Sequence, residues 1–527
     1  MLYPSDHLTS EERDRLAPHV THLDGPVFGL VNLPETVKGA LFARYSRYPG
    51  TLRRLLLDEF AESLDPGASF DGSEGERAAA LYERIFVGYG DDSVAQLGGA
   101  HIACEWASNV LTKLLQRPRL AAYLEQSTRY IAYDAPMPGA GGYRYHRDPE
   151  LGPPYESAMG ALFATYAEAL PVVRSWVDET FTPAPGDSAG ARARAVNAKA
   201  LDLLRGLLPA ASLSHMGIYA TGQAYEQLIL HLLGHPLPEA RAYGTMILDA
   251  VKATMPSFVA RVERPERGGE WITQLENRRA SGERWAARLG LDHDLAADGR
   301  PSVRLLQVDG DEDRLLAALL FEAAAANEQT TLDAVRALGT EQRAQLLSDL
   351  VGERANRRHR PGRGFEALRY RFEIVSDYGA FRDLQRHRML TVQWQRLTPD
   401  LGAAVPDEVV AAGAGEAYAT ALEVSRSEYG RLVGAGYSAA APYALCLGFR
   451  IRYVLDLNAR EAMHLIELRS GREGHPSYRA VAHEMHAQIA ARHPAVAATM
   501  VHVDAETEPR LERILSEMRT EARTHAP

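Results

Sequence analysis

The chain has 527 residues, a hydrophobic share of 46% and a formal net charge of −11. This is too much chain for one ordinary core, so we expect two domains. The acidic balance excludes a protein that coats nucleic acid, so any anion site must come from locally gathered arginines. The only cysteines, Cys104 and Cys446, exclude a disulfide framework and a cysteine-rich zinc site.

The first residues lack a basic stretch followed by an apolar run, so the sequence predicts no signal peptide. No window approaches about 18 uninterrupted apolar residues, so it predicts no membrane span. We therefore expect a cytoplasmic protein in a reducing compartment, without membrane or nucleic-acid partners.

Amphipathic helix patterns dominate the chain, for example at residues 193–209 and 312–326. Strand patterns are few. The clearest are Val303–Val308 and Phe365–Ser376, each followed by a turn signal. The sequence therefore predicts an α+β fold that is rich in helix and has small sheets.

Residues 262–301 have the composition of a connector, with Pro265, Gly268 and Gly269 in a charged mixture. The halves on either side share a weak repeat, in which a basic cluster is followed after a long gap by a Gly-His-Pro triplet. We predict an N-terminal repeat at 1–261, a linker at 262–301 and a C-terminal repeat at 302–527.

The first candidate site segment is Leu124–Tyr130, which contains Glu125, Ser127 and Arg129. Ser127 and Arg129 are two residues apart, and a hydroxyl beside a guanidinium is a common grip for phosphate. The alternative is a purely structural turn.

The densest basic cluster is Arg382–Arg388. Arg382 and Arg386 are four residues apart and would share a helix face. The run Arg386-His387-Arg388 cannot be buried without partners, so it is either a solvated face or a clamp for phosphate groups. A second triplet, Arg358–Arg360, lies beside proline and glycine and is predicted to be a solvated loop.

A further polar cluster extends to Arg469. Asn458 is placed to cap a helix, with Glu461 as the partner in a capping box. The cluster is either surface charge or the lining of a pocket. Its other members are Arg452, Arg460, His464, Glu467 and Arg469.

Other motifs are missing. No Gly-x-Gly-x-x-Gly opens a helix after a strand, and no P-loop is present. The histidines in His483–His486 are three apart, whereas a zinc protease helix needs them four apart. Cys446 lies in an apolar run and is predicted to be a buried small hydrophobe. The sequence predicts no metal site.

Together the clusters resemble the flavin-dependent thymidylate synthases, whose signature reads R-H-R-x-x-S-x-N-x-x-S-x-R. Arg386-His387-Arg388 matches its beginning in the second half. The first half has Arg117-Pro118-Arg119 there, but matches the end of the signature with Ser127 and Arg129. The two halves thus resemble complementary remnants of one motif.

The downstream region divides in the same way. The second half keeps the family's basic and polar residues, whereas the first half has Leu232 at the position that corresponds to Arg469. Two departures stand out: Asp383 replaces a glutamine of the family, and Ala367 replaces a histidine. The matching residues are Arg452, Asn458, Arg460, His464 and Arg469.

The resemblance implies the following roles. Arg469 would stabilise negative charge on the uracil ring and is the expected catalytic residue. FAD would be held by Arg386, His387, Arg388, Asn458, Arg460 and His464. The uracil nucleotide would be held by Glu125, Ser127, Arg129, Arg386, Arg452 and Arg469.

The resemblance also implies a reaction: reductive methylation of dUMP to dTMP, with methylenetetrahydrofolate and NADPH as co-substrates. Family members place their sites between the subunits of a tetramer, so a homodimer of this two-repeat chain would imitate that tetramer. Three alternatives stay open: a flavin- or nucleotide-binding protein without turnover, C5 alkylation of another pyrimidine nucleotide, and an unrelated helical scaffold with surface arginines.

Overall fold

The computed structural model describes residues 6–33, 35–45, 48–61, 98–137, 142–291 and 299–524, and the single residues 3, 64 and 96. The chain divides into two compact units, each built from separate stretches of sequence. Unit 1 comprises residues 1–168, 207–296 and 420–446, and unit 2 comprises residues 169–206, 297–419 and 447–527. Each unit is described by itself.

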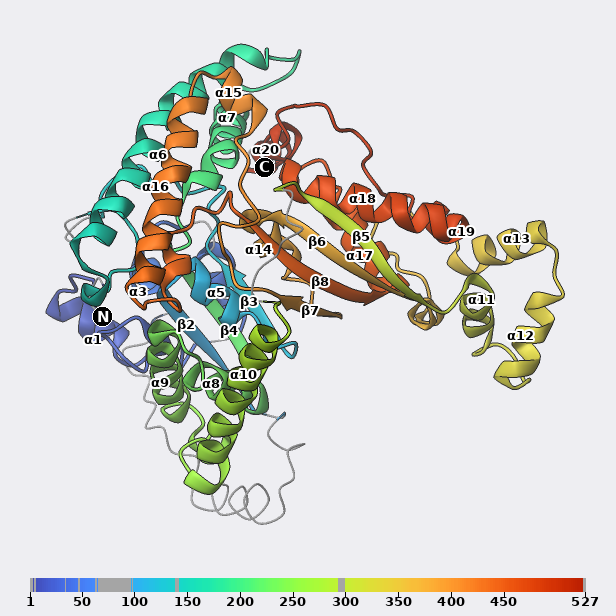
Figure 1. Ribbon diagram of the computed structural model, residues 1–527, viewed down its shortest axis with the longest axis horizontal. Coiled ribbons are helices and arrows are strands. Elements are labelled where there is room, and N and C mark those ends of the chain that lie inside the picture. Colours follow the sequence, from blue (N-terminus) through green and yellow to red (C-terminus); the bar gives the residue numbers. More distant parts are fainter. Residues whose placement is uncertain are drawn as a thin grey trace. The chain divides into compact units, whose positions relative to one another are not determined.

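Each unit contains a four-stranded antiparallel sheet with the same topology (Figure 1). The order is β1-β2-β4-β3 in unit 1 and β5-β6-β8-β7 in unit 2, which confirms the prediction of two fused, related parts. The strands are β1 (Val27–Gly29), β2 (Gly99–Ser108), β3 (Ala121–Glu125), β4 (Leu213–Thr221), β5 (Ser302–Asp309), β6 (Arg369–Asp377), β7 (Leu390–Trp394) and β8 (Arg450–Asn458).

Alternation along β8 explains why this segment forms a strand with one buried face. Tyr453, Leu455 and Leu457 are buried, whereas Arg452 and Asp456 are only half-buried. Side chains two residues apart share a face of a strand, so β8 sends its apolar residues into the core and its charged residues to the opposite face.

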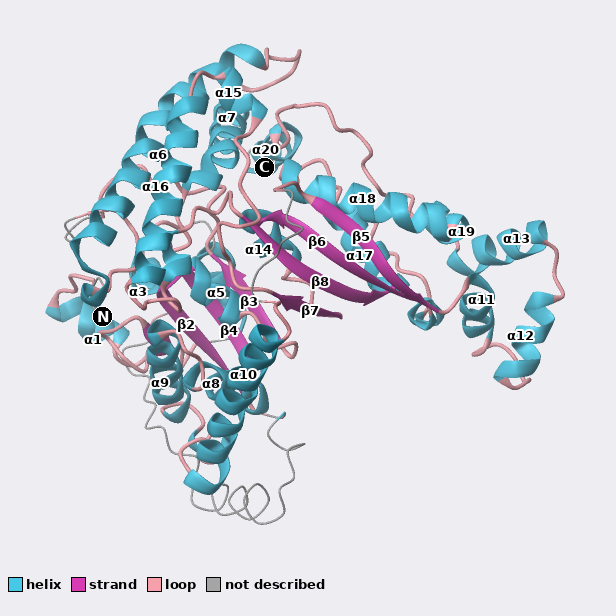
Figure 2. Cartoon of the chain, in the orientation of Figure 1, coloured by secondary structure: helices cyan, strands magenta, loops and turns pink. Residues whose placement is uncertain are grey.

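Helices make up most of the described chain (Figure 2). In unit 1, α8 follows β4 directly and packs on α9 and α10. Two long helices, α6 (Gly152–Thr180) and α16 (Gly415–Gly434), run from one unit into the other. The other helices of unit 1 are α1 (Ser10–Leu16), α2 (Glu35–Tyr45), α3 (Leu52–Glu59), α5 (Asn109–Leu115), α8 (Gly222–Leu233), α9 (Pro238–Lys252) and α10 (Glu270–Arg288).

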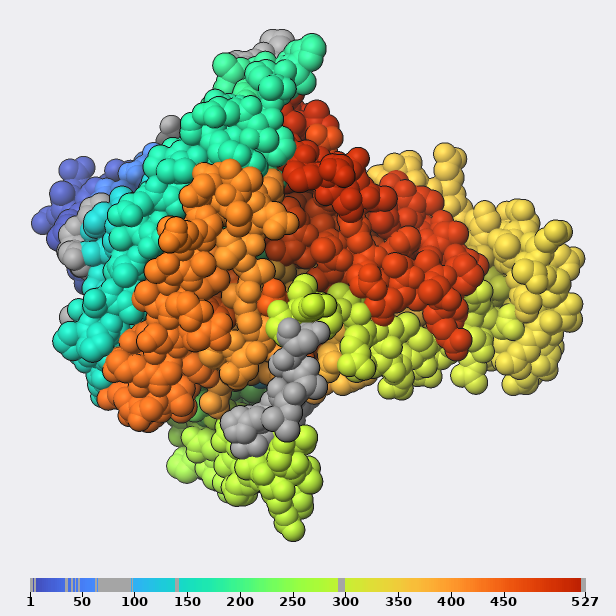
Figure 3. Space-filling model, turned by 45° about the horizontal axis from the view of Figure 1, so that its top comes forward, coloured from blue at the N-terminus to red at the C-terminus, as the bar shows by residue number. Residues whose placement is uncertain are grey.

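In unit 2, α18 packs across β5 and β6. The helices α11, α12 and α13 form a lobe at one end of this unit (Figure 3). The helices of unit 2 are α7 (Ala189–Leu204), α11 (Glu312–Leu320), α12 (Glu328–Arg336), α13 (Thr340–Val351), α14 (Tyr378–Leu384), α15 (Asp407–Ala411), α17 (Ala459–Arg469), α18 (Pro476–Arg492), α19 (Pro494–Ala498) and α20 (Ile514–Thr524).

The predicted α+β class is confirmed, and β5 covers the predicted strand Val303–Val308. The predicted strand Phe365–Ser376 is confirmed only from Arg369 onwards, because its first residues belong to a 3-10 helix, Arg363–Ala367, that precedes β6. The connector contains a regular element: α10 begins at Glu270 and buries Leu275. The predicted boundaries at 261 and 302 remain a prediction, because the compact units do not follow the order of the chain. No helix in the described residues combines the length and apolarity needed to cross a membrane.

Candidate functional site

The helix α17 carries most of the residues predicted to hold the flavin. The Asn458 side chain accepts a hydrogen bond of 2.9 Å from the Glu461 backbone N–H, which caps the first turn. The predicted N-cap is therefore confirmed. The predicted capping box is wrong, because the Glu461 carboxylate bonds the ring of His387 instead of turning back to the cap.

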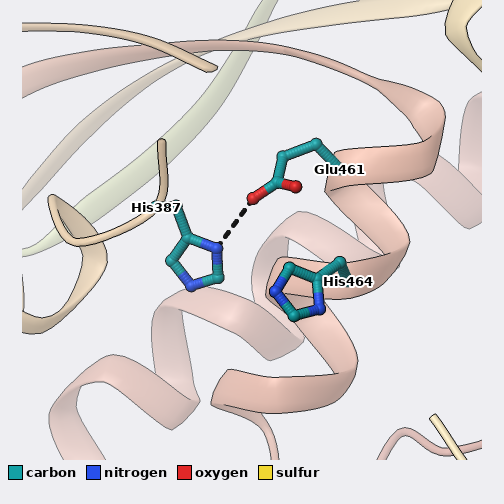
Figure 4. Close-up of side chains that lie close together, drawn as sticks. All are labelled: His387, Glu461 and His464. Carbon is teal, nitrogen blue, oxygen red and sulfur yellow. Dashed lines mark hydrogen bonds and ion pairs between the residues drawn. The ribbon is translucent and has the colours of Figure 1, made fainter. Parts of the chain in front are cut away.

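His387 lies just after α14 and is buried between two charged partners, of which Glu461 is drawn in Figure 4. Its Nδ1 lies 2.8 Å from Glu461 Oε1, and its Nε2 accepts a hydrogen bond of 3.0 Å from Arg469 Nε. Since Arg469 can only donate, the ring proton is on Nδ1. Burial, together with Arg469, holds the pKa of His387 well below its usual value, so the imidazole is neutral at physiological pH.

Arg469 is the last residue of α17. Burial lowers the pKa of its guanidinium, while the negative charge of Asp383 opposes that shift. Its guanidinium carbon lies 5.6 Å from the centre of the Tyr478 ring. The helix thus ends in a desolvated positive charge whose Nε is fixed by His387, which suits an electrostatic role.

His464 lies on the same helix, near His387. The two ring centres are 5.3 Å apart, and Arg360 Nη2 lies 3.3 Å from His464 Nδ1. Burial lowers the pKa of His464 to about 4, so this ring is also neutral near pH 7. One turn earlier, Arg460 donates a hydrogen bond of 2.9 Å to the carbonyl of Pro361. The segment Arg358–Arg360 is an exposed loop, as the sequence pattern predicted, and it also borders the site.

His387, Glu461 and His464 bring potential metal-ligand atoms within 4.8 Å of one another. Two observations favour an anion over a cation at this place. The proton on His387 Nδ1 occupies the lone pair that a metal would need, because Arg469 fixes the tautomer. Arg469 and Arg360 also raise the local positive potential.

Arg386 and Arg388 are exposed beside this buried group. Asp383 lies between two arginines: its carboxylate is 3.7 Å from Arg386 and 3.2 Å from Arg205. The acid that replaces the family's glutamine is therefore balanced by two positive charges. Of the predicted pair on one helix face, Arg382 is buried in α14, whereas Arg386 lies beyond the end of that helix.

Arg205 is a buried residue that sequence reasoning missed. It comes directly after α7, a first-half helix that belongs to unit 2. Its Nη1 bonds Asp383, while its Nε and Nη2 have no hydrogen-bond partner among the described residues. It also lines a cavity of about 590 Å³ in unit 2. No local sequence signal identifies it, since a single arginine near a helix end is commonplace.

Glu467 has a structural role. Both of its oxygens lie 2.6 Å from the guanidinium of Arg354, and both side chains are buried. This bidentate pair joins α17 to the segment after α13. The sequence pattern placed Glu467 in one polar cluster with Arg460 and His464. It does not line the site that those two residues form.

Arg452 lies on β8, on the strand face that also carries Asp456. It is half-buried and pairs in register with Val375. Unit 2 therefore contains all the predicted flavin residues. His387 and His464 are brought together, while Arg452 lies on the sheet rather than on α17.

The other predicted nucleotide residues belong to unit 1. Glu125 Oε2 lies 3.0 Å from Lys113 Nζ in a pair that is almost fully buried, so this acid helps hold the fold. The Ser127 hydroxyl accepts a hydrogen bond of 3.2 Å from the Arg129 backbone N–H, which makes the segment a turn. Their binding of a nucleotide stays a prediction.

A profile of the thymidylate synthase complementing protein family matches residues 53–257 and 304–495. The chain belongs to this family. Because the profile matches twice, the thymidylate synthase complementing unit is present in two copies, as the paired sheets also indicate.

Two relatives align with almost the whole chain. The chain is 35% identical to a UPF0159 protein of Chlamydia muridarum, over 99% of this chain and 100% of that protein. A UPF0159 protein of Thermoplasma acidophilum is 30% identical over 92% and 98% of the two chains. A solved structure of a UMP/dUMP methylase, PolB from Streptomyces cacaoi, is 20% identical with a TM-score of 0.31, covering 38% of this chain and 95% of that one.

Proposed function

We propose that this protein is a FAD-dependent thymidylate synthase, which methylates dUMP reductively to dTMP with methylenetetrahydrofolate and NADPH. The observation that carries the proposal is the buried chain of hydrogen bonds from Glu461 through His387 to Arg469, next to exposed Arg386 and Arg388. Membership of the thymidylate synthase complementing protein family supports it.

The residues of unit 2 fit a flavin dinucleotide. Arg386 and Arg388 offer guanidinium forks of the kind that bind a diphosphate, and Arg460 lies on the adjoining helix. His464 is a half-buried neutral ring that can pack against a flat heterocycle without adding charge, and the buried ring of His387 beside it is neutral too. When bound, a reduced flavin supplies a hydride.

Arg469 would act on the nucleotide. A uracil that accepts hydride at C6 gains negative charge on its ring, and a buried guanidinium stabilises that charge more strongly than an exposed one. His387 fixes Arg469 Nε, and Tyr478 packs against the same guanidinium, so the charge is held in one place. In this proposal the nucleotide is bound by Ser127, Arg129, Arg386 and Arg452. Glu125 supports the segment Leu124–Tyr130 from the core.

Two measurements on the purified protein test the proposal. The first is the flavin content by absorbance, and the second is NADPH-dependent tritium release from C5-labelled dUMP with methylenetetrahydrofolate. We expect bound flavin and tritium release. Bound flavin without release from dUMP or UMP would indicate a binding protein that lacks turnover, and release from UMP alone would indicate a different pyrimidine substrate. Absence of flavin would contradict the cofactor assignment.

A further inference from the structure

A basic pocket in unit 1 has no part in the function proposed above. It has a volume of about 210 Å³, and its floor is apolar, with Leu114, Leu232 and Leu275. None of its described lining residues is acidic. Its polar lining is entirely basic: Arg117, His231, His235, Arg278 and Arg279.

The linker supplies part of this pocket. Arg278 and Arg279 lie on α10, which packs on α8 through the buried side chain of Leu275. His231 lies on α8 and His235 just after it. Because α10 carries both arginines on the side that faces α8, the connector between the repeats also completes a site.

The basic groups repel one another. Desolvation beside the pocket and the charges of Arg278 and Arg279 lower the pKa of Arg117, although the residue as a whole is exposed. Burial and the neighbouring arginines lower the pKa of His235 to about 4. Glu283 and Glu276, on α10 itself, partly counter the charge of Arg279. Several cations held together around a cavity are stabilised when an anion enters it.

Hydrogen bonds define what the histidines can offer. His235 Nδ1 accepts from the Leu237 backbone N–H at 3.1 Å, so its proton is on Nε2, which can donate to a ligand. His231 Nδ1 lies 2.7 Å from the Gln227 carbonyl and therefore carries a proton, which fixes the ring orientation. The pocket thus combines three guanidinium groups with an oriented imidazole donor.

The position of the pocket in the repeat is informative. The helix α8 follows β4 as α17 follows β8, and Arg117 follows α5 as Arg386 follows α14. The basic residue at the end of α17, Arg469, corresponds to Leu232 in this pocket. The position that would stabilise charge on a uracil ring is therefore apolar here, which favours binding without chemistry.

We propose that this pocket of unit 1 binds the phosphate or diphosphate group of a small molecule. Guanidinium forks match phosphate oxygens in pairs. The volume suits one or two phosphoryl groups, and the leucines of the lining add no charge of their own. This site is separate from the cluster on α17, so the two proposals can fail independently.

Calorimetric titration of the full-length protein with orthophosphate, pyrophosphate and dUMP tests the site and distinguishes the free anions from a nucleotide phosphate. The double variant Arg278→Ala, Arg279→Ala removes two guanidinium donors. Arg278 is exposed and Arg279 is half-exposed. We expect the double variant to bind pyrophosphate at least about tenfold more weakly, since it loses two charged hydrogen-bond donors.

Arg284→Ala is the matched control, because Arg284 is an exposed arginine of the same helix outside the pocket. It should bind like the wild type, and circular dichroism should show all variants folded. Equal affinity in the double variant and the control, or no saturable binding to the wild type, would overturn the proposal. Loss of binding in Arg469→Ala instead would place the anion at α17.

Discussion

At the scale of single residues, the ring of His387 joins a buried carboxylate to a half-buried guanidinium. Glu461 accepts from one side of the ring and Arg469 donates to the other. Because the tautomer is fixed, rotation of the ring would break both hydrogen bonds at once. The orientation of Arg469 therefore depends on Glu461, a residue that does not touch the guanidinium.

Arg469→Ala should reduce turnover by about 10²–10³-fold, the usual effect of removing a donor aimed at developing charge. The His387 Nε2 acceptor would lose its partner, at a cost of about 1–3 kcal/mol in the free energy of unfolding. Tritium release measures the first effect and thermal unfolding the second.

Arg492→Ala is a suitable control for Arg469→Ala, since Arg492 is an exposed arginine at the end of α18. It should leave tritium release unchanged. If Arg469→Ala retained full turnover, Arg469 would have no part in the chemistry.

Glu461→Gln tests the dependence of Arg469 on the ring. The amide oxygen can still accept from His387 Nδ1, so the fold should persist, but the negative charge that opposes Arg469 disappears. We expect kcat to fall while the KM for dUMP changes little. Unchanged kcat in Glu461→Gln, with a loss in Glu461→Ala, would show that the hydrogen bond matters and the charge does not.

Glu105 makes stability depend on pH. It is buried near Arg53, and burial raises its pKa from 4.5 to about 7. A carboxyl with a raised folded-state pKa stabilises the fold below about pH 4.5 and loses that contribution as the pH rises towards 7. At roughly 1.4 kcal/mol per pKa unit, the loss is about 3 kcal/mol.

Denaturant unfolding of the wild type and Glu105→Gln between pH 4.5 and 7 would measure this difference. As the pH rises from 4.5 to 7, the free energy of unfolding of the wild type should fall relative to that of Glu105→Gln. The variant should therefore be relatively more stable at pH 7 than at pH 4.5. A difference that stays constant across this range would show that Glu105 titrates normally.

At the scale of elements, α17 depends on its first residue. Asn458 caps the helix through its side-chain oxygen. Asn458→Ala should lower the free energy of unfolding by about 1 kcal/mol. Asn458→Asp keeps the capping oxygen and adds negative charge, so stability should be retained while flavin binds more weakly. If flavin binds equally well to Asn458→Asp, Asn458 acts on the helix alone.

Local patterns predicted the elements well where a short-range signal existed. The cap at Asn458 and the strands β5 and β6 follow from neighbouring residues. The partner of Glu461 could not be predicted in this way, because the choice between a capping box and His387 is decided by how α14 packs near α17. Burial of Arg205 beside Asp383 joins residues 178 positions apart, and no spacing rule reaches so far.

At the scale of the whole molecule, the two copies have diverged unequally. The second copy keeps the basic residues of α17, and the first has Leu232 in place of an arginine. We expect one FAD per chain of 57.9 kDa, and a homodimer by light scattering. Two flavins per chain would show that the first copy also binds the cofactor, and a monomer with full flavin loading would contradict the dimer.

The exchange of segments between units has a consequence for synthesis. Unit 1 needs residues 420–446, and unit 2 takes residues 169–206 from the early part of the chain. Unit 1 is complete only once residue 446 has left the ribosome, and unit 2 only later, so neither unit is complete for most of translation. Separate expression of 1–261 and 302–527 should therefore yield insoluble fragments, and co-expression should rescue them.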